Sequence, residues 1–201
     1  MDDFFSSNQV ILSGLPCAIP AFSHESRRKL FYTFPLQVER LSGYADKVNI
    51  IIRQEMLPLL PKSLDTYIRI GGELRSFNNR SGEGSKLVIT VFAREIEETE
   101  ADWENSVELA GTICKAPTLR QTPLGREICD ILLAVNRRYG RSDYLPCIAW
   151  GMNARLASQL QVGDRVVLTG RLQSREYIKN ADGEILRRTA FEVSVSELQP
   201  L

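Results

Sequence analysis

The stretch LLAVNRRYGRSDYLPCIAWG, Leu132–Gly151, decides the fold and function of this chain. Its two apolar runs, Ile131–Val135 and Tyr144–Trp150, predict two strands joined by a charged loop. Aromatic residues lie near the strand ends and the loop, at Tyr139, Tyr144 and Trp150.

Arginines stand between these aromatic residues, at Arg137, Arg138 and Arg141. Aromatic faces interleaved with guanidinium groups suit a single nucleic-acid strand, because bases stack on the rings and phosphates meet the charges. The other interpretation places the rings in the core and the arginines on a solvated rim. This stretch alone does not separate the two interpretations.

The composition indicates a folded globular protein, with 43% hydrophobic and 25% charged residues in 201. Lys+Arg and Asp+Glu both number 25, so the total charge points to no class of partner. The halves differ, since Asn105–Leu201 holds 13 basic and 10 acidic residues and the first 104 residues hold 12 and 15. A polyanion is therefore expected on the second half.

The chain shows no targeting or membrane segment. Its start, MDDFFSSN, lacks the basic and apolar regions of a signal peptide, and no apolar run approaches the roughly 20 residues of a membrane span. The widely spaced cysteines form no C-x-x-C pair, which indicates reduced thiols rather than a zinc site or disulfides. We therefore expect a cytoplasmic protein with no cofactor, no metal and no membrane partner.

Three sequence blocks occur twice in the same order: NQVILSG and NSVELAG, IRIGGEL and VVLTGRL, VFAREI and VSVSEL. Their offsets are 97, 98 and 102 residues, which grow along the chain as loop insertions would make them. This pattern predicts a duplicated domain of about 100 residues, a common domain size. The predicted domains are 1–103, which includes an acidic linker, and 104–201.

Each copy is expected to contain five strands. In the first copy these are Gln9–Ser13, Leu30–Leu41, Val48–Ile52, Tyr67–Arg75 and Leu87–Arg94, with Leu15–Lys29 as a loop. A short helix is expected between strands three and four of each copy, at Glu55–Leu64 and at Asn153–Leu160, where Asn153 would be the N-cap. Five strands with this helix predict an all-β chain of two tandem OB-fold barrels, a fold known for binding oligonucleotides and oligosaccharides.

The segment that joins the copies, Glu95–Glu104, carries six carboxylates. We expect a solvated linker. The alternative is an acidic strap that competes with DNA for a basic groove.

The second half resembles the DNA-binding domain of bacterial single-stranded DNA-binding proteins (SSB). The motifs that carry this resemblance occur in family order within Asn105–Leu198: NSVELAG, LRQTPLG, LLAVNR, PCIAWG, GDRVVLTGRLQSREY and TAFEVSV. Together they are specific, although each alone is weak.

The resemblance implies a set of DNA-binding residues. Four aromatic stacking positions match Tyr139, Tyr144, Trp150 and Tyr177, three of which are Tyr where the best-known family member has Trp. The candidates for phosphate contact are Arg120, Arg137, Arg138, Arg155, Arg171 and Arg175. For each arginine, the alternative is an ordinary solvated residue or an ion-pair partner.

The first half resembles the family only in its barrel blocks. Aligning Gly72 with Gly170 places Ile52 opposite Trp150, and the same alignment places Asp46 opposite Tyr144. We therefore expect a degenerate OB barrel that suits assembly or a protein partner. Because family members usually present four barrels, the resemblance implies a homodimer of this two-barrel chain.

No enzyme motif is present: the sequence lacks G-x-x-x-x-G-K-[ST], G-x-G-x-x-G, H-E-x-x-H and G-x-S-x-G, and its one histidine, His24, lies in a polar stretch. The expected function is sequence-independent binding of single-stranded DNA in replication, recombination or repair, with replication and repair proteins as further partners. The alternative is an OB-fold adaptor of a replisome, primosome or mobile element, whose main ligand is a protein. RNA binding would use the same surface.

Overall fold

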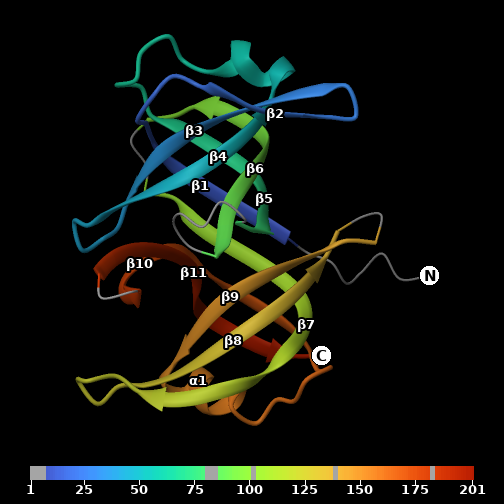
Figure 1. Ribbon diagram of the computed structural model, residues 1–201, viewed down its shortest axis with the longest axis vertical. Helices are drawn as coiled ribbons and strands as arrows, with labels where there is room; N and C mark the ends of the chain where they lie inside the picture. The colour runs from blue at the N-terminus through green and yellow to red at the C-terminus, as the bar shows by residue number, and fades with distance from the viewer. Residues whose placement is uncertain (1–7, 80–85, 101–102, 138–139, 182–183) are drawn as a thin grey trace. The chain divides into compact units, whose positions relative to one another are not determined.

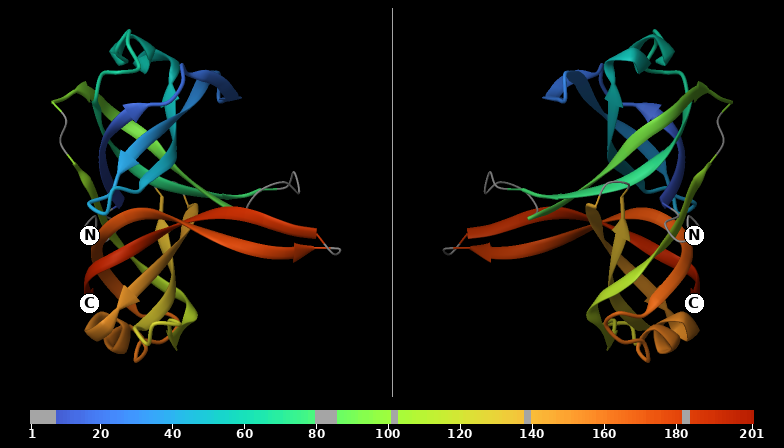
Figure 2. Two further views of the ribbon diagram at one scale, coloured as in Figure 1. Left: turned by 90° about the vertical axis from the view of Figure 1, so that its left-hand side faces the viewer. Right: turned by 90° about the vertical axis from the view of Figure 1, so that its right-hand side faces the viewer.

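The computed structural model describes residues 8–79, 86–100, 103–137, 140–181 and 184–201, which fold as two compact units (Figures 1 and 2). The first barrel comprises Gln9–Arg75 and Thr90–Ser106. The second barrel comprises Val107–Leu201 and groups with Ser76–Ile89, the end of a hairpin that the first half supplies. This division differs from a single cut after Trp103.

The first barrel is built from six strands and one short helix. Its strands are hydrogen-bonded in the order β1-β5-β6-β4-β3-β2, and pairing of β1 with β3 closes the barrel. The 3₁₀ helix η1 lies between β4 and β5 in the chain. The bounds are β1 Asn8–Pro16, β2 Ala21–Ser26, β3 Lys29–Glu39, β4 Ala45–Arg53, η1 Gln54–Leu59, β5 Ile68–Asn78 and β6 Leu87–Glu98.

The second barrel repeats this plan with five strands. They are ordered β10-β11-β9-β8-β7, and β10 pairs with β7 to close the barrel. In each barrel one strand pair is parallel, β4 with β6 and β9 with β11. The bounds are β7 Asn105–Gln121, β8 Glu127–Asn136, β9 Ser142–Trp150, α1 Gly151–Ala157, β10 Arg165–Ala181 and β11 Glu184–Pro200.

Alternation of buried and exposed positions places the two cores. Along β9, Leu145 and Cys147 are buried inside the barrel, and Tyr144 lies on the outer face. Glycine is needed where strands cross closely: a Cβ on Gly14 would lie 2.1 Å from the Gln37 carbonyl oxygen. A Cβ on Gly111 of the second barrel would lie 2.6 Å from the Ala134 carbonyl oxygen, so the glycine that ends each repeat block allows the same close approach of a neighbouring strand.

These observations confirm the predicted all-β fold, and they correct some of its details. Ala21–Ser26, expected within a loop, is strand β2 and pairs with β3. Asn153 is not the N-cap of the helix: α1 begins at Gly151 after Trp150, and the Asn153 side-chain amide donates to the Ser196 carbonyl oxygen at 2.9 Å. A tertiary hydrogen bond has therefore replaced the local capping bond.

The acidic linker is only partly a solvated loop. Strand β6 extends to Glu98, so the first four of the ten linker residues belong to that strand. The Arg69 guanidinium donates to Glu104 at 2.6 Å and to Glu97 at 3.1 Å, and its hydrogen bond with Glu104 raises the pKa of Arg69. Glu97 and Glu104, at the end of the first barrel, therefore both accept hydrogen bonds from Arg69 of β5.

All four cysteines are free thiols, and Cys129 and Cys147 are buried in the second barrel. Burial raises the pKa of the Cys147 thiol far above its ordinary value, so the side chain stays neutral in the core. Within the described ranges, no helix is both long and apolar enough to cross a membrane.

Candidate nucleic-acid interface

The outer face of β9 carries two of the predicted stacking residues. Cross-strand pairing sets Tyr144 opposite Ala134 and Trp150 opposite Ile128, and side chains six positions apart share one face of a strand. At about 3.3 Å per residue, the two rings lie roughly 20 Å apart along β9. They can therefore serve separate bases of one extended strand.

Trp150 lies at the end of β9 with its indole only partly exposed. Its Nε1–H donates to the Ser194 Oγ of β11 at 3.1 Å, which fixes the ring orientation. Ser194 pairs with Ile148 across the parallel β9–β11 contact, so Ser194 belongs to the same outer face. The ring is held by one polar edge at the surface, outside the barrel core.

Tyr177 extends this face onto the long β10–β11 hairpin, which runs past the rest of the second barrel (Figure 2). It pairs with Arg188, and the same side of β10 carries Arg171 opposite Ser194 and Arg175 opposite Ala190. Alternation therefore puts Tyr177, Arg171 and Arg175 on the side of the hairpin that also bears Ser194.

Two of the predicted phosphate-contacting arginines form ion pairs on this surface, Arg120 with an exposed carboxylate and Arg175 with a largely buried one. Arg120 donates to both carboxylate oxygens of Asp130, at 2.5 and 3.0 Å, and this hydrogen bonding raises the pKa of Arg120. Arg175 lies 3.3 Å from Glu192. Arg171 is exposed, and the described part of the chain records no ion pair for it. An exposed pair such as Arg120–Asp130 contributes little, at most about 1 kcal/mol, so a phosphate can replace the Asp130 carboxylate.

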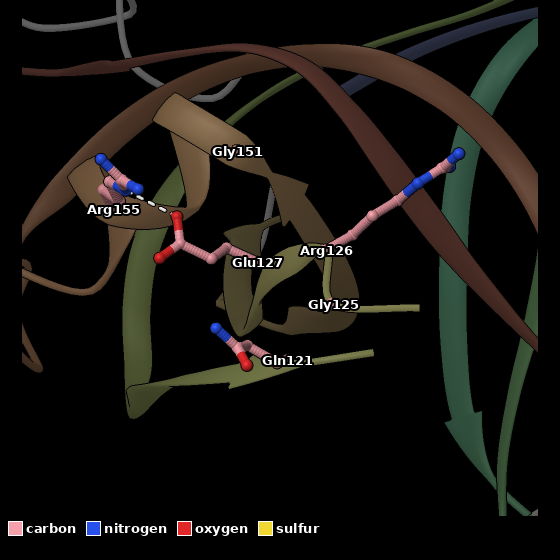
Figure 3. A pocket seen from close by; sticks show the side chains of 6 residues that line it. All are labelled: Gln121, Gly125, Arg126, Glu127, Gly151 and Arg155. Carbon is pink, nitrogen blue, oxygen red and sulfur yellow. Dashed lines mark hydrogen bonds and ion pairs between the residues drawn. The ribbon is translucent and has the colours of Figure 1, made fainter. Parts of the chain in front are cut away.

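Arg155 lines a pocket of about 520 Å³ beside the β7–β8 turn and the start of α1 (Figure 3). Its Nε donates to Glu127 at 2.6 Å, and this hydrogen bond raises the pKa of Arg155. Figure 3 shows Arg126 pointing away from that pair. The pocket lining is complete with Gln121, Gly125 and Gly151.

Arg137 differs from the other arginines because its partner is buried. The Asp143 side chain is 0% exposed, and it accepts the Arg137 Nε at 2.6 Å and also the Arg137 Nη2. Nη2 further donates to the Ser76 carbonyl oxygen at 3.3 Å. Arg137 is therefore fixed at the end of the barrel, and any phosphate contact would fall to its Nη1.

Two of the predicted site residues, Arg138 and Tyr139, lie outside the described residues. The structure therefore brings Tyr144, Trp150, Tyr177, Arg120, Arg171 and Arg175 to the outer sheet face, and it places Arg155 in the pocket and Arg137 at the barrel end.

The first barrel contains the same buried ion pair. Arg40 donates to Asp46 through Nε and Nη2, each at 2.6 Å, and Asp46 is 0% exposed. Asp46 pairs with Val38 as Asp143 pairs with Val135. The barrels are thus related here by an offset of 97 residues, which corrects the sequence alignment of Asp46 with Tyr144.

At this offset the first barrel presents a different outer face. Lys47 takes the place of Tyr144, and Arg53 takes the place of Trp150. An aromatic ring is nevertheless present on β6, where Arg94 stacks over Phe92 at 4.8 Å. The first barrel therefore offers cations where the second offers stacking rings.

Sequence reasoning missed three residues of this region: Ser194, Asp143 and Ser76. They act on side chains or backbone 44, 6 and 68 residues away, on Trp150, Arg137 and Tyr144 respectively. The Arg-to-Asp spacing of six, repeated in both copies, is the one signal that was available in the sequence.

These features define a class: an all-β protein of two OB-fold barrels, one of which displays aromatic rings and arginines on its outer sheet face. Residues 104–201 match the model of the single-strand binding protein family. Single-stranded DNA-binding protein B of Bacillus subtilis is 36% identical over 86 residues, which cover 39% of this chain and 75% of that protein. The chain belongs to the single-strand binding protein family.

Two further comparisons extend this result. Single-stranded DNA-binding protein A of B. subtilis is 35% identical over 104 residues, 48% of this chain and 60% of that protein. The single-stranded DNA binding protein from Thermus aquaticus has a crystal structure with a TM-score of 0.74 at 25% identity, covering 98% of this chain and 94% of that one. The chain spans about three fifths of the length of several curated relatives, such as the Halalkalibacterium halodurans protein at 61%.

Proposed function

We propose that this protein binds single-stranded DNA with little dependence on sequence. The observation that carries the proposal is Trp150, a partly exposed ring fixed by Ser194 on the outer face of an OB barrel. Tyr144 and Tyr177 extend the same face. Every base has a π-face, so stacking on these rings is tolerant of sequence.

The arginines of this face supply the electrostatic part of binding. Arg120, Arg171 and Arg175 would contact phosphates, with Arg155 of the pocket and the Nη1 group of Arg137 as further contacts. Arg120 would release its exposed partner Asp130 at small cost, whereas Arg175 would keep its contact with the largely buried Glu192. Arg138 and Tyr139 keep the roles that their motif implies.

The direct test is a fluorescence anisotropy titration of labelled oligothymidine, repeated with duplex DNA and with RNA of equal length. We expect the single-stranded DNA to bind more tightly than the duplex, because only unpaired bases can stack on the rings; the RNA arm measures the preference between the two kinds of single strand. Equal affinity for the duplex would contradict the proposal, since it would indicate backbone contacts alone.

Salt should weaken DNA binding, and the number of exposed arginines that contact phosphates should determine how steeply the affinity falls with salt. Each neutralised phosphate of a single strand contributes a slope of roughly −0.7 in log K against log salt. Arg171→Ala should therefore make the slope less steep by about 0.7. Lys62→Ala, which removes an exposed cation of the first barrel, is the matched control and should leave the slope unchanged. An identical slope in Arg171→Ala and wild type would exclude a phosphate contact there.

We also propose that the chain forms a homodimer that presents four barrels. Light scattering coupled to gel filtration at micromolar concentration should give about twice the chain mass of 22.7 kDa. A symmetric dimer is the common arrangement for a homo-oligomer. A mass of one chain would rule out the dimer.

The proposed roles follow from binding: protection of exposed strands in replication, recombination and repair, with proteins of those processes as partners. We propose a non-catalytic protein that acts in the cytoplasm, where thiols such as those of Cys129 and Cys147 stay reduced.

A further inference from the structure

The end of the β5–β6 hairpin is joined to the second barrel by Ser76. Its backbone N–H donates to the Asp143 Oδ1 at 2.6 Å, and its carbonyl oxygen accepts the Arg137 Nη2 at 3.3 Å. Its Oγ accepts the backbone N–H of Tyr144 at 2.7 Å. One residue of the first half of the chain thus satisfies three polar groups around the start of β9.

These bonds occupy an edge of β9 that its neighbouring strand leaves open. The recorded pairing of β9 with β11 covers only Cys147 and Ile148, further along the strand. Near the start of β9, the Tyr144 N–H donates to the Ser76 hydroxyl and not to a neighbouring strand. The hairpin end therefore fixes the backbone that carries the Tyr144 ring.

Phe77 follows Ser76 directly and is 49% exposed, as is Tyr144. Side chains alternate along a strand, so the buried Ser76 faces the second barrel and Phe77 faces solvent. Consecutive Cα atoms are about 3.8 Å apart, which keeps Phe77 next to the bonds that Ser76 makes with Arg137 and Tyr144. An exposed ring beside a guanidinium is the pairing that single-strand binding uses.

We infer that the single-stranded DNA site continues from Tyr144 onto Phe77, and that Ser76 positions the two relative to each other. This inference rests on the proposed function. Phe77 is a stacking residue, and Ser76 is a positioning residue that acts through Tyr144. The first half of the chain then supplies part of the binding surface of the second barrel.

Phe77→Ala in the full-length chain tests the stacking role, with Kd for oligothymidine measured by anisotropy. We expect a Kd about five- to 150-fold higher, the loss of one stacked base. Phe22→Ala is the matched control, since Phe22 is a 59% exposed phenylalanine of the first barrel, and it should bind as wild type. Wild-type affinity in Phe77→Ala, or an equal loss in Phe22→Ala, would overturn the stacking role.

Ser76→Ala tests the positioning role. Loss of one neutral hydrogen bond should raise the Kd about two- to twelvefold. Ser76→Thr keeps the hydroxyl and should bind as wild type, which a general packing effect of residue 76 would not allow. In a Tyr144→Ala background, Ser76→Ala should have no further effect. An unchanged Kd in Ser76→Ala, or full additivity with Tyr144→Ala, would overturn this role.

The same titrations distinguish this inference from the proposed function. If the wild-type chain binds oligothymidine and Trp150→Ala reduces that binding, an unaffected Phe77→Ala refutes only the extension onto the hairpin. If the wild-type chain does not bind, the proposed function and this inference both fail.

Discussion

Trp150→Ala should weaken the binding of single-stranded DNA by about five- to 150-fold, because one stacked base is worth about 1–3 kcal/mol. The salt dependence of binding should not change, since the substitution removes no charge. The variant should stay folded, because the indole is at the outer face of β9 and its one recorded hydrogen bond is to Ser194.

Fluorescence separates this stacking role from a core role. In a Trp103→Phe background, Trp150 is the only tryptophan of the chain. A stacked indole should be strongly quenched by saturating oligothymidine, and Trp150→Phe, which keeps a ring, should retain more affinity than Trp150→Ala. An emission that does not respond to saturating DNA, together with early melting of Trp150→Ala, would place the ring in the core and refute the stacking role.

The apolar run Tyr144–Trp150 predicted strand β9, and the resemblance to the family selected Tyr144 and Trp150 on it as stacking residues. Tyr144 and Pro146 alternate with the buried Asp143, Leu145 and Cys147, whereas Ile148 is buried as well, so the alternation covers only the first part of the strand. The repeated blocks predicted two barrels, since each block is part of a strand, and the first block of each copy ends on a glycine that close packing requires, Gly14 and Gly111. Pattern and spacing were sufficient wherever the deciding interactions are local.

The correspondence between the barrels shows where pattern was insufficient. The sequence alignment through Gly72 and Gly170 gave an offset of 98 residues, and the strand pairing gives 97 at β4 and β9. A shift of one residue exchanges the two faces of a strand. It set Ile52, a core residue, against Trp150, whereas the residue at that place on the outer face is Arg53.

Distant hydrogen bonds account for the other differences. Asn153 has the side chain of an N-cap, but the Ser196 carbonyl oxygen, 43 residues away, accepts its amide hydrogen. Ser76 and Asp143 are 67 residues apart in the sequence, and the residues around each of them give no indication that the two are hydrogen-bonded. Such pairs depend on how the strands are brought together, which a single sequence does not display.

Arg137→Ala should destabilise the fold more than the substitution of an arginine that has an exposed partner. It leaves the Asp143 carboxylate, 0% exposed, without its cation. Breaking a buried pair from one side costs about 3–5 kcal/mol of unfolding free energy, because the remaining charge stays buried. The N–H of Ser76 still donates to Asp143, so we expect the lower end of that range. Guanidinium chloride unfolding followed by circular dichroism measures the change.

Arg120→Ala is the matched control, because Arg120 and Asp130 form a similar two-bond pair with side chains that are 41% and 46% exposed. Its cost should not exceed about 1 kcal/mol. Arg40→Ala breaks the equivalent buried pair of the first barrel and should resemble Arg137→Ala. Equal stability of Arg137→Ala and Arg120→Ala would show that burial of Asp143 does not set the strength of the pair.

The salt dependence then separates the two contributions of Arg137 to DNA binding. If Nη1 contacts a phosphate, Arg137→Ala should make the slope of log K against log salt less steep by roughly 0.7. If Arg137 acts only by holding Asp143 and Ser76, the affinity should fall with an unchanged slope, because Tyr144 loses the frame that positions its ring. We expect Arg137→Ala to lower the affinity and also to make the slope less steep. An unchanged slope would show that Arg137 contacts no phosphate, and it would leave its role in positioning Asp143 and Ser76 intact.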